Sequence, residues 1–109
     1  MTFRKYRWSK DYESAEEELE RLLAAKQIVA ERWSAEPGET FSPHTHPHPK
    51  QLWCAEGSLT LTINGKALSL QPGDALELPA STPHEGVAGI NGCVCYEAPP
   101  TAENPTQLV

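Results

Sequence analysis

The sequence predicts an all-β fold, an antiparallel sandwich or barrel, with one short α-helix near the N-terminus. Three observations support this fold class: an apolar repeat of about 3.6 residues before residue 27, an alternating repeat after it, and turn sequences at regular intervals. The chain has 109 residues, of which 39% are hydrophobic, so it has room for one core. We expect a single domain with an arm and helix at residues 1–27, a β-domain at 28–98 and a proline-rich tail at 99–109.

The N-terminal arm has an unusual distribution of charge. Residues 1–10 combine basic with aromatic side chains, and acidic side chains dominate residues 11–20. We interpret the arm as a terminal strand whose charges pair locally or face solvent. A basic, aromatic arm for an anionic partner is the alternative.

A helix is predicted between Ser14 and Lys26. Ser14 and Glu17 form a capping-box pattern, and the acidic residues of the first turn suit the positive end of the helix dipole. The apolar residues recur at the spacing of one helical face: Ala15, Leu19, Leu22 and Leu23. This face predicts a helix that packs on the β-domain, and no side chain of the helix indicates catalysis.

After residue 27 apolar and polar residues alternate, which is typical of half-buried strands. Asn64-Gly65 separates two such runs and is a strong hairpin signal. Gly57, Gly89 and Gly92 are expected to interrupt strands. The predicted strands are residues 28–34, 51–55, 58–63, 66–70, 75–78 and 87–97.

Charge and composition narrow the function classes. The net charge is −6, whereas nucleic-acid binding needs a basic surface that displaces counterions from phosphates, so no nucleic-acid partner is expected. No apolar run reaches the roughly 20 residues of a membrane helix, and no segment near Met1 resembles a secretory signal. We therefore expect a cytoplasmic protein without membrane contact. Three cysteines lack the spacing of zinc or redox motifs and are interpreted as buried thiols: Cys54, Cys93 and Cys95.

The histidines are the residues that most clearly indicate chemistry. His44, His46 and His48 lie within five positions, and the fourth histidine is His84. Residues two apart on an extended segment point to the same side, so His44 and His46 can direct two imidazoles to one point, as a transition metal requires. A surface histidine cluster without a ligand is the alternative interpretation of this pair.

The spacing around these histidines resembles the first signature motif of the cupin family. That motif has a glycine, five residues, His-x-His, three or four residues, a glutamate, six residues and a second glycine. Gly38, His44, His46, Lys50 and Gly57 match every spacing, although a lysine stands in place of the glutamate. The resemblance implies a cupin β-barrel, jelly-roll-like and made of two antiparallel sheets, over roughly residues 28–98.

The second cupin motif is also present. Gly73-Asp74, Pro79 and His84 match it in register, with Ser81 in place of a glycine and Ala88 in place of an asparagine. Cupins include isomerases, oxygenases, seed-storage proteins and transcriptional sensors, so the fold alone does not specify the function.

The resemblance implies a metal site formed by His44, His46 and His84 inside the barrel. The ion expected there is a divalent transition metal: iron, manganese, nickel or zinc. The resemblance also implies a homodimer, since small cupins commonly pair and exposed strand edges need cover.

Lys50 is the departure that bears most on this site, because an ammonium repels a cation and cannot replace an anionic ligand. Either Lys50 turns outward and three histidines remain, or metal binding is weak or absent. Gln51 takes the glutamate position if the spacing is counted as four, but the distance to Gly57 then fails. His48 shares the parity of His46 and is either a substitute ligand or a surface residue.

A three-histidine site resembles that of the thiol dioxygenases within the cupins, which commonly have a tyrosine and a cysteine near the metal. Cys54 and Tyr96 are the candidates for these positions in this chain. The alternative for Cys54 is a core residue without chemistry.

Three functions follow as hypotheses. The first is a metal-dependent cupin, such as a dioxygenase or an isomerase, in which a small polar ligand coordinates the ion. The second is a metal-free binding or sensor protein in which Lys50 holds an anionic small molecule. The third is a structural domain with a vestigial site.

Overall fold

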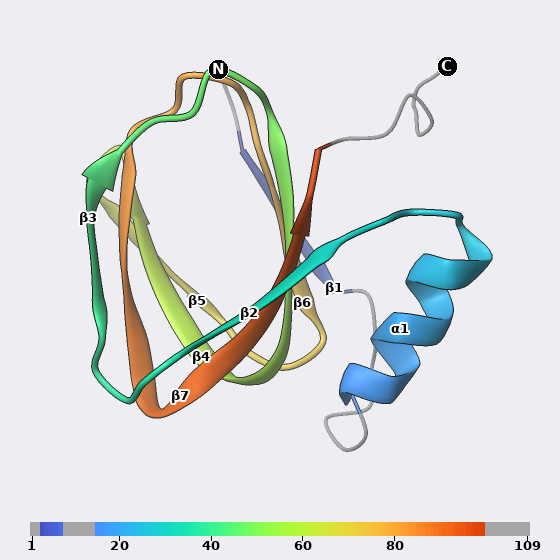
Figure 1. Ribbon diagram of the computed structural model, residues 1–109. Helices are drawn as coiled ribbons and strands as arrows, with labels where there is room; N and C mark the ends of the chain where they lie inside the picture. The colour runs from blue at the N-terminus through green and yellow to red at the C-terminus, as the bar shows by residue number, and fades with distance from the viewer. Residues whose placement is uncertain (1–2, 8–14, 100–109) are drawn as a thin grey trace.

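The structure, a computed structural model, describes residues 3–7 and 15–99 (Figure 1). The described part contains one helix and seven strands: β1 (Arg4–Arg7), α1 (Ala15–Ala25), β2 (Glu31–Ala35), β3 (Thr40–His44), β4 (Lys50–Ile63), β5 (Lys66–Leu70), β6 (Asp74–Leu78) and β7 (His84–Ala98). All strand pairs are antiparallel and belong to one seven-stranded sheet. The predicted all-β fold with a short N-terminal helix is confirmed.

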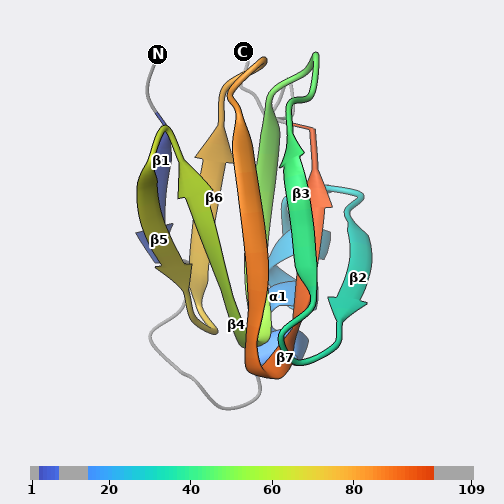
Figure 2. The same ribbon diagram turned by 90° about the vertical axis from the view of Figure 1, so that its left-hand side faces the viewer.

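The sheet is organised around β4 and β7, which pair along nearly their whole lengths, from Gln51–Ala98 to Ile63–His84. Both strands bend near the middle, where the register shifts twice (Figure 1). One half of the pair forms a layer with β6, β1 and β2, and the other half forms a layer with β5 and β3, which lies in front of the first layer in Figure 2. The two predicted sheets are therefore two halves of one folded sheet, and no described strand pair closes the barrel.

The bend depends on two glycines. Gly57 and Gly92 have positive φ angles of +70° and +74°, and a Cβ atom on Gly57 would lie 2.0 Å from the Gly92 carbonyl oxygen. Only glycine allows the two backbones to approach this closely. The prediction of separate strands at 51–55 and 58–63 was wrong, because pairing with β7 resumes after each register shift and keeps β4 continuous.

The first layer is buried on both faces. Along β4, Leu52 and Cys54 belong to the core between the layers, whereas Trp53 and Ala55 belong to a second core beneath α1. Helix α1 contributes two buried leucines to this second core, Leu19 and Leu23. The predicted apolar face of the helix thus packs on the sheet, and alternate residues of β4 are buried against different partners.

The hairpin predicted at Asn64-Gly65 is confirmed and joins β4 to β5. Asn64 and Gly65 have φ angles of 53° and 80°, as a two-residue turn between twisted antiparallel strands requires. Ile63 pairs with Lys66 on either side of this turn, so the predicted register is also observed.

β1 is the terminal strand expected for the arm, and its charges pair with β6. The Arg4 guanidinium donates two hydrogen bonds of 3.0 and 2.9 Å to the Glu77 carboxylate, and Lys5 Nζ lies 3.6 Å from Asp74. The rest of the arm, the capping residue Ser14 and residues 100–109 of the tail lie outside the described residues.

In the part of the chain that the structure describes, no helix has the length and apolar character needed to cross a membrane.

Because β7 is bent, its two ends lie at the same end of the molecule, together with the end of β3 and the start of β4 (Figure 1). Residues that are far apart in sequence therefore meet at this end of the two layers, which carries the candidate site.

Replacing Gly57 by alanine is expected to destabilise the protein by at least about 2 kcal/mol more than replacing Gly38. Both glycines have similar φ angles, +70° and +74°, so both variants carry the torsional cost of about 1–2 kcal/mol. Only the Gly57 variant adds a clash, because nothing lies within 4 Å of a Cβ atom on Gly38. Urea unfolding of both variants measures the difference, and equal losses would contradict the role of close backbone approach.

Candidate metal centre

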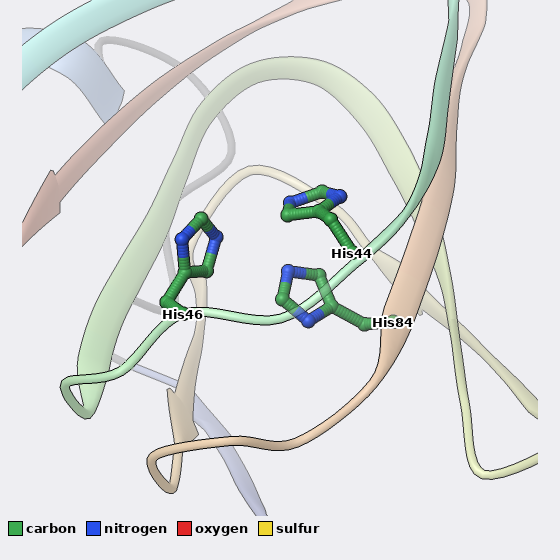
Figure 3. A group of neighbouring side chains, drawn as sticks. All are labelled: His44, His46 and His84. Carbon is green, nitrogen blue, oxygen red and sulfur yellow. The ribbon is translucent and has the colours of Figure 1, made fainter.

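Three of the four histidines meet at this end of the sheet. His44 is the last residue of β3, His84 is the first residue of β7, and the two are paired in register. His46 lies two residues beyond β3, where its carbonyl oxygen accepts a 2.7 Å hydrogen bond from the Ser81 amide. Figure 3 shows the three rings gathered from these two segments of the chain.

The spacing of the rings suits a single metal ion. The ring centroids are 4.3 Å apart for His44 and His84, 4.7 Å for His44 and His46, and 5.2 Å for His46 and His84. One nitrogen of each ring lies within 4.8 Å of the other two. Nitrogens bound to one ion at about 2.1 Å are at most about 4.2 Å apart, so small side-chain movements suffice. The donor set therefore fits a divalent transition metal.

Backbone carbonyls orient two of the imidazoles. His44 Nδ1 lies 2.6 Å from the Ser42 carbonyl oxygen, and His84 Nδ1 lies 2.8 Å from that of Thr82. When Nδ1 carries the proton and donates it to the carbonyl, Nε2 keeps its lone pair for a metal ion. The same i to i−2 contact on both strands thus prepares two rings to act as ligands.

Burial favours the uncharged form of two rings, which is the form that binds a metal. Desolvation is the main cause that lowers the pKa of His84 and of His46 from 6.5. The positive charge of Lys50 lowers the pKa of both histidines as well, whereas the carboxylate of Glu97 raises it. The neutral form of His84 and His46, which is the form that binds a metal, is therefore favoured.

The histidines line a cavity of about 350 Å³ between the two layers. The remaining wall is mainly apolar: Trp33, Phe41, Leu52, Leu59, Leu61 and Leu78. The Trp33 and Phe41 rings meet edge to face, with centroids 5.5 Å apart, and Trp33 Nε1 is buried without a hydrogen-bond partner among the described residues. A cavity of this kind suits a small ligand with an apolar body and few polar atoms.

Three charged residues also line the cavity: Glu31, Lys50 and Glu97. Lys50 does not turn outward, because its Nζ donates a 2.9 Å hydrogen bond to Glu97 Oε2. Sequence reasoning missed both glutamates. The signal available in the sequence was the alternation of side chains along a strand. Glu31 points to the same side of its strand as the cavity residue Trp33, and Glu97 to the same side as the core residue Cys95.

His48 and Gln51, the two alternative ligands, lie apart from the histidine cluster. The cluster that the structure forms among its described residues consists of His44, His46 and His84, and His48 is exposed outside it. Gln51 follows Lys50 on β4, so its side chain points to the opposite face of the sheet.

Cys54 and Tyr96 are not brought together with the histidines. Cys54 is fully buried in the core between the layers. Tyr96 lies in the core beneath α1, on the other face of the sheet, where its hydroxyl is 2.6 Å from a carboxylate oxygen of each of two helix residues, Glu16 and Glu20. The tyrosine and the cysteine suggested by the resemblance to thiol dioxygenases are therefore separated, because their side chains point to opposite faces of the sheet.

Known proteins resemble this chain in sequence. The model of the family described as "Cupin domain" matches residues 31–89. Quercetin 2,3-dioxygenase of Bacillus subtilis is 31% identical over an alignment of 74 residues, and the match covers 62% of this chain and 22% of that enzyme. Dimethylsulfoniopropionate lyase DddW of Ruegeria pomeroyi is 38% identical over 56 residues, 51% of this chain and 37% of that enzyme. The chain thus covers well under half the length of these curated relatives.

Solved structures show the same fold. A cupin superfamily protein from Desulfitobacterium hafniense superposes with a TM-score of 0.60 and 15% sequence identity, over 90% of this chain and 76% of that chain. At this level of identity the likeness shows a shared fold only. The shared fold is consistent with the seven-stranded sheet described above.

Replacing His84 by alanine is expected to weaken the binding of a divalent metal at least about tenfold, because one of three converging nitrogens is lost. The matched control is His48→Ala, which removes an exposed histidine outside the cluster. Competition with a chromophoric chelator measures both affinities. A His84→Ala protein that binds metal as tightly as the control would contradict the three-histidine assignment.

The metal-free protein is expected to lose stability as the pH falls below 6.5, the ordinary pKa of histidine. Burial lowers the pKa of His84 in the folded state, so the unfolded chain binds protons more readily and acid favours unfolding. Melting temperatures between pH 7.5 and 5.5, measured with a chelator present, test this expectation. The decline should be shallower in His84→Gln, and an equal or steeper decline would contradict it.

Proposed function

The chain belongs to the cupin family, and from this premise we propose that it is a metal-dependent cupin that acts on a small molecule. His44, His46 and His84 would hold one divalent transition-metal ion at the edge of the cavity. The observation that carries the proposal is the convergence of three ring nitrogens, within 4.8 Å of one another, on the wall of a 350 Å³ cavity.

Each part of the cavity has a role in this proposal. A divalent ion bound by the histidines supplies Lewis-acid or oxygen-binding chemistry to a ligand atom beside it. The carbonyl oxygens of Ser42 and Thr82 orient two of the imidazoles. The apolar wall excludes water from the body of the ligand, and Trp33 Nε1, which has no hydrogen-bond partner among the described residues, provides one donor for a ligand oxygen.

An enzymatic role is supported by the number of protein ligands. Three ligands leave coordination positions open for a substrate, as in catalytic rather than structural metal sites. The two curated relatives are named as a dioxygenase and a lyase. Of the two reaction classes expected from the sequence, dioxygenase and isomerase, we favour the dioxygenase, because the relative with the longer matching segment carries that name.

The alternative, a metal-free protein that binds an anion through Lys50, has less support. The Lys50 ammonium is already paired with the Glu97 carboxylate at 2.9 Å, and Glu31 adds a further negative charge to the cavity wall. An incoming anion must displace Glu97 and approach a second carboxylate.

The proposal also includes a cytoplasmic homodimer. Each layer ends in strands that pair on one side only with described strands, β1 and β2 in one layer and β5 and β3 in the other. Such edges are commonly covered by a second subunit. Light scattering during size-exclusion chromatography measures the mass directly.

Purified protein is expected to bind close to one divalent metal ion per chain, measured by inductively coupled plasma mass spectrometry after loading and desalting. The control is the triple variant with alanine at positions 44, 46 and 84, which should retain almost none. In the cobalt-loaded protein, azide should shift the visible absorption, because open positions accept an external ligand. Absence of metal would contradict the proposal, and absence of an azide shift would contradict an open site. Oxygen uptake with quercetin then tests the dioxygenase class.

A further inference from the structure

We propose that Glu97 is the anionic residue of the metal centre, which neutralises Lys50 and supplies negative charge to a site of three neutral imidazoles. This inference rests on the proposed metal-binding function. It assigns a role to a residue outside the histidine cluster, and it explains how a lysine is tolerated beside a cation site.

The strand register places Glu97 in the cavity. On β7, Glu97 lies opposite Glu31 of β2 on one side and opposite Leu52 of β4 on the other. Lys50 precedes Leu52 by two residues, so both side chains point to the same face of the sheet. Glu31, Lys50 and Glu97 therefore lie on three neighbouring strands and face one cavity, which the histidines also line.

Lys50 and Glu97 form a close and partly buried ion pair. Lys50 Nζ lies 2.9 Å from Glu97 Oε2, and the two side chains are 31% and 26% exposed. The bond engages one carboxylate oxygen of Glu97, and no hydrogen bond to the other oxygen is found among the described residues. The Lys50 ammonium is thus held beside a carboxylate and moves less freely than the ammonium of a surface lysine.

Both charges face the histidines, because Lys50, Glu97 and the three imidazole rings line one cavity. An ammonium and a carboxylate on this wall act on a bound cation in opposite directions. Removing Glu97 leaves the Lys50 ammonium as an unbalanced positive charge there.

A metal ion makes this balance important. Three neutral imidazoles contribute no negative charge, so a bound dication keeps its full charge in a largely apolar cavity. An unpaired ammonium nearby would oppose that ion, and a carboxylate would stabilise it. Mutation of a group beside the metal ligands typically lowers the metal affinity by about 10–100-fold, and we expect an effect of this size.

The experiment is a set of Co²⁺ affinities, measured by competition with a chromophoric chelator. Glu97→Gln should weaken binding about tenfold or more, because the Lys50 ammonium then lacks its paired carboxylate. Lys50→Met should tighten binding by a similar factor, because the Glu97 carboxylate then lacks its paired ammonium. The double variant removes both charges and should return to within about threefold of the wild type. Melting temperatures of the metal-free proteins verify that every variant is folded.

Glu31→Gln is the matched control. Glu31 is a carboxylate on the wall of the same cavity, and it lies directly opposite Glu97 in register. Among the described residues the Lys50 ammonium pairs with Glu97, so the loss of Glu31 should leave this pair intact and change the affinity less than about threefold. A loss as large as that of Glu97→Gln would overturn the assignment to Glu97.

The charge swap is the sharpest variant. The chain with Lys50→Glu and Glu97→Lys keeps the pair and its net charge and places a carboxylate at the motif position, so it should bind Co²⁺ at least as tightly as the wild type, whereas Glu97→Lys alone should abolish binding. If the wild type binds Co²⁺ and Glu97→Gln binds it equally well, this inference fails and the proposed function stands. If no variant binds Co²⁺, both fail.

Discussion

The long antiparallel pairing of β4 with β7 is the interaction on which the rest of the structure depends. Every other strand except β1 pairs with one of these two, and β1 is attached through β6. The bend at Gly57 and Gly92 folds this pair into two layers, which enclose one core and leave a second face for α1. The same bend returns both ends of β7 to one end of the molecule, so that His84 and Glu97 line one cavity although they begin and nearly end the same strand.

Charge balance governs what this cavity can hold. Its wall combines aliphatic and aromatic side chains with three histidines and three charged residues. In isolation a lysine beside the histidines argues against a cation, because like charges repel across a medium of low polarity. The Glu97 carboxylate changes that argument, since the lysine charge is paired within 2.9 Å. In this proposal, Lys50 is one member of an ion pair between two strands, at the position where the cupin motif has a glutamate.

Much of the fold could be predicted because local patterns report local structure. The apolar stripe with Leu19 and Leu23, and the turn at Asn64-Gly65, each depend on neighbours a few residues away, and both are confirmed. The predictions were less accurate where pairing between distant strands decides the secondary structure. Separate strands before and after Gly57 were expected, because a glycine interrupts a strand in isolation. Pairing with β7 instead carries β4 through the bend.

The family resemblance, the helix, the hairpin and the three histidines follow from the sequence alone, because each is encoded in residue types at the fixed spacings of a helical face, a turn or a cupin motif. The tertiary structure alone decided the surroundings of the histidines. Strand parity sends Tyr96 beneath α1 and its neighbour Glu97 into the cavity, and strand register brings Glu97 opposite Glu31, tens of residues away along the chain. No local pattern specifies which charged residue of one strand meets which residue of another. Folding of the paired strands β4 and β7 brings Lys50 to Glu97, and this contact sets the charge around the site.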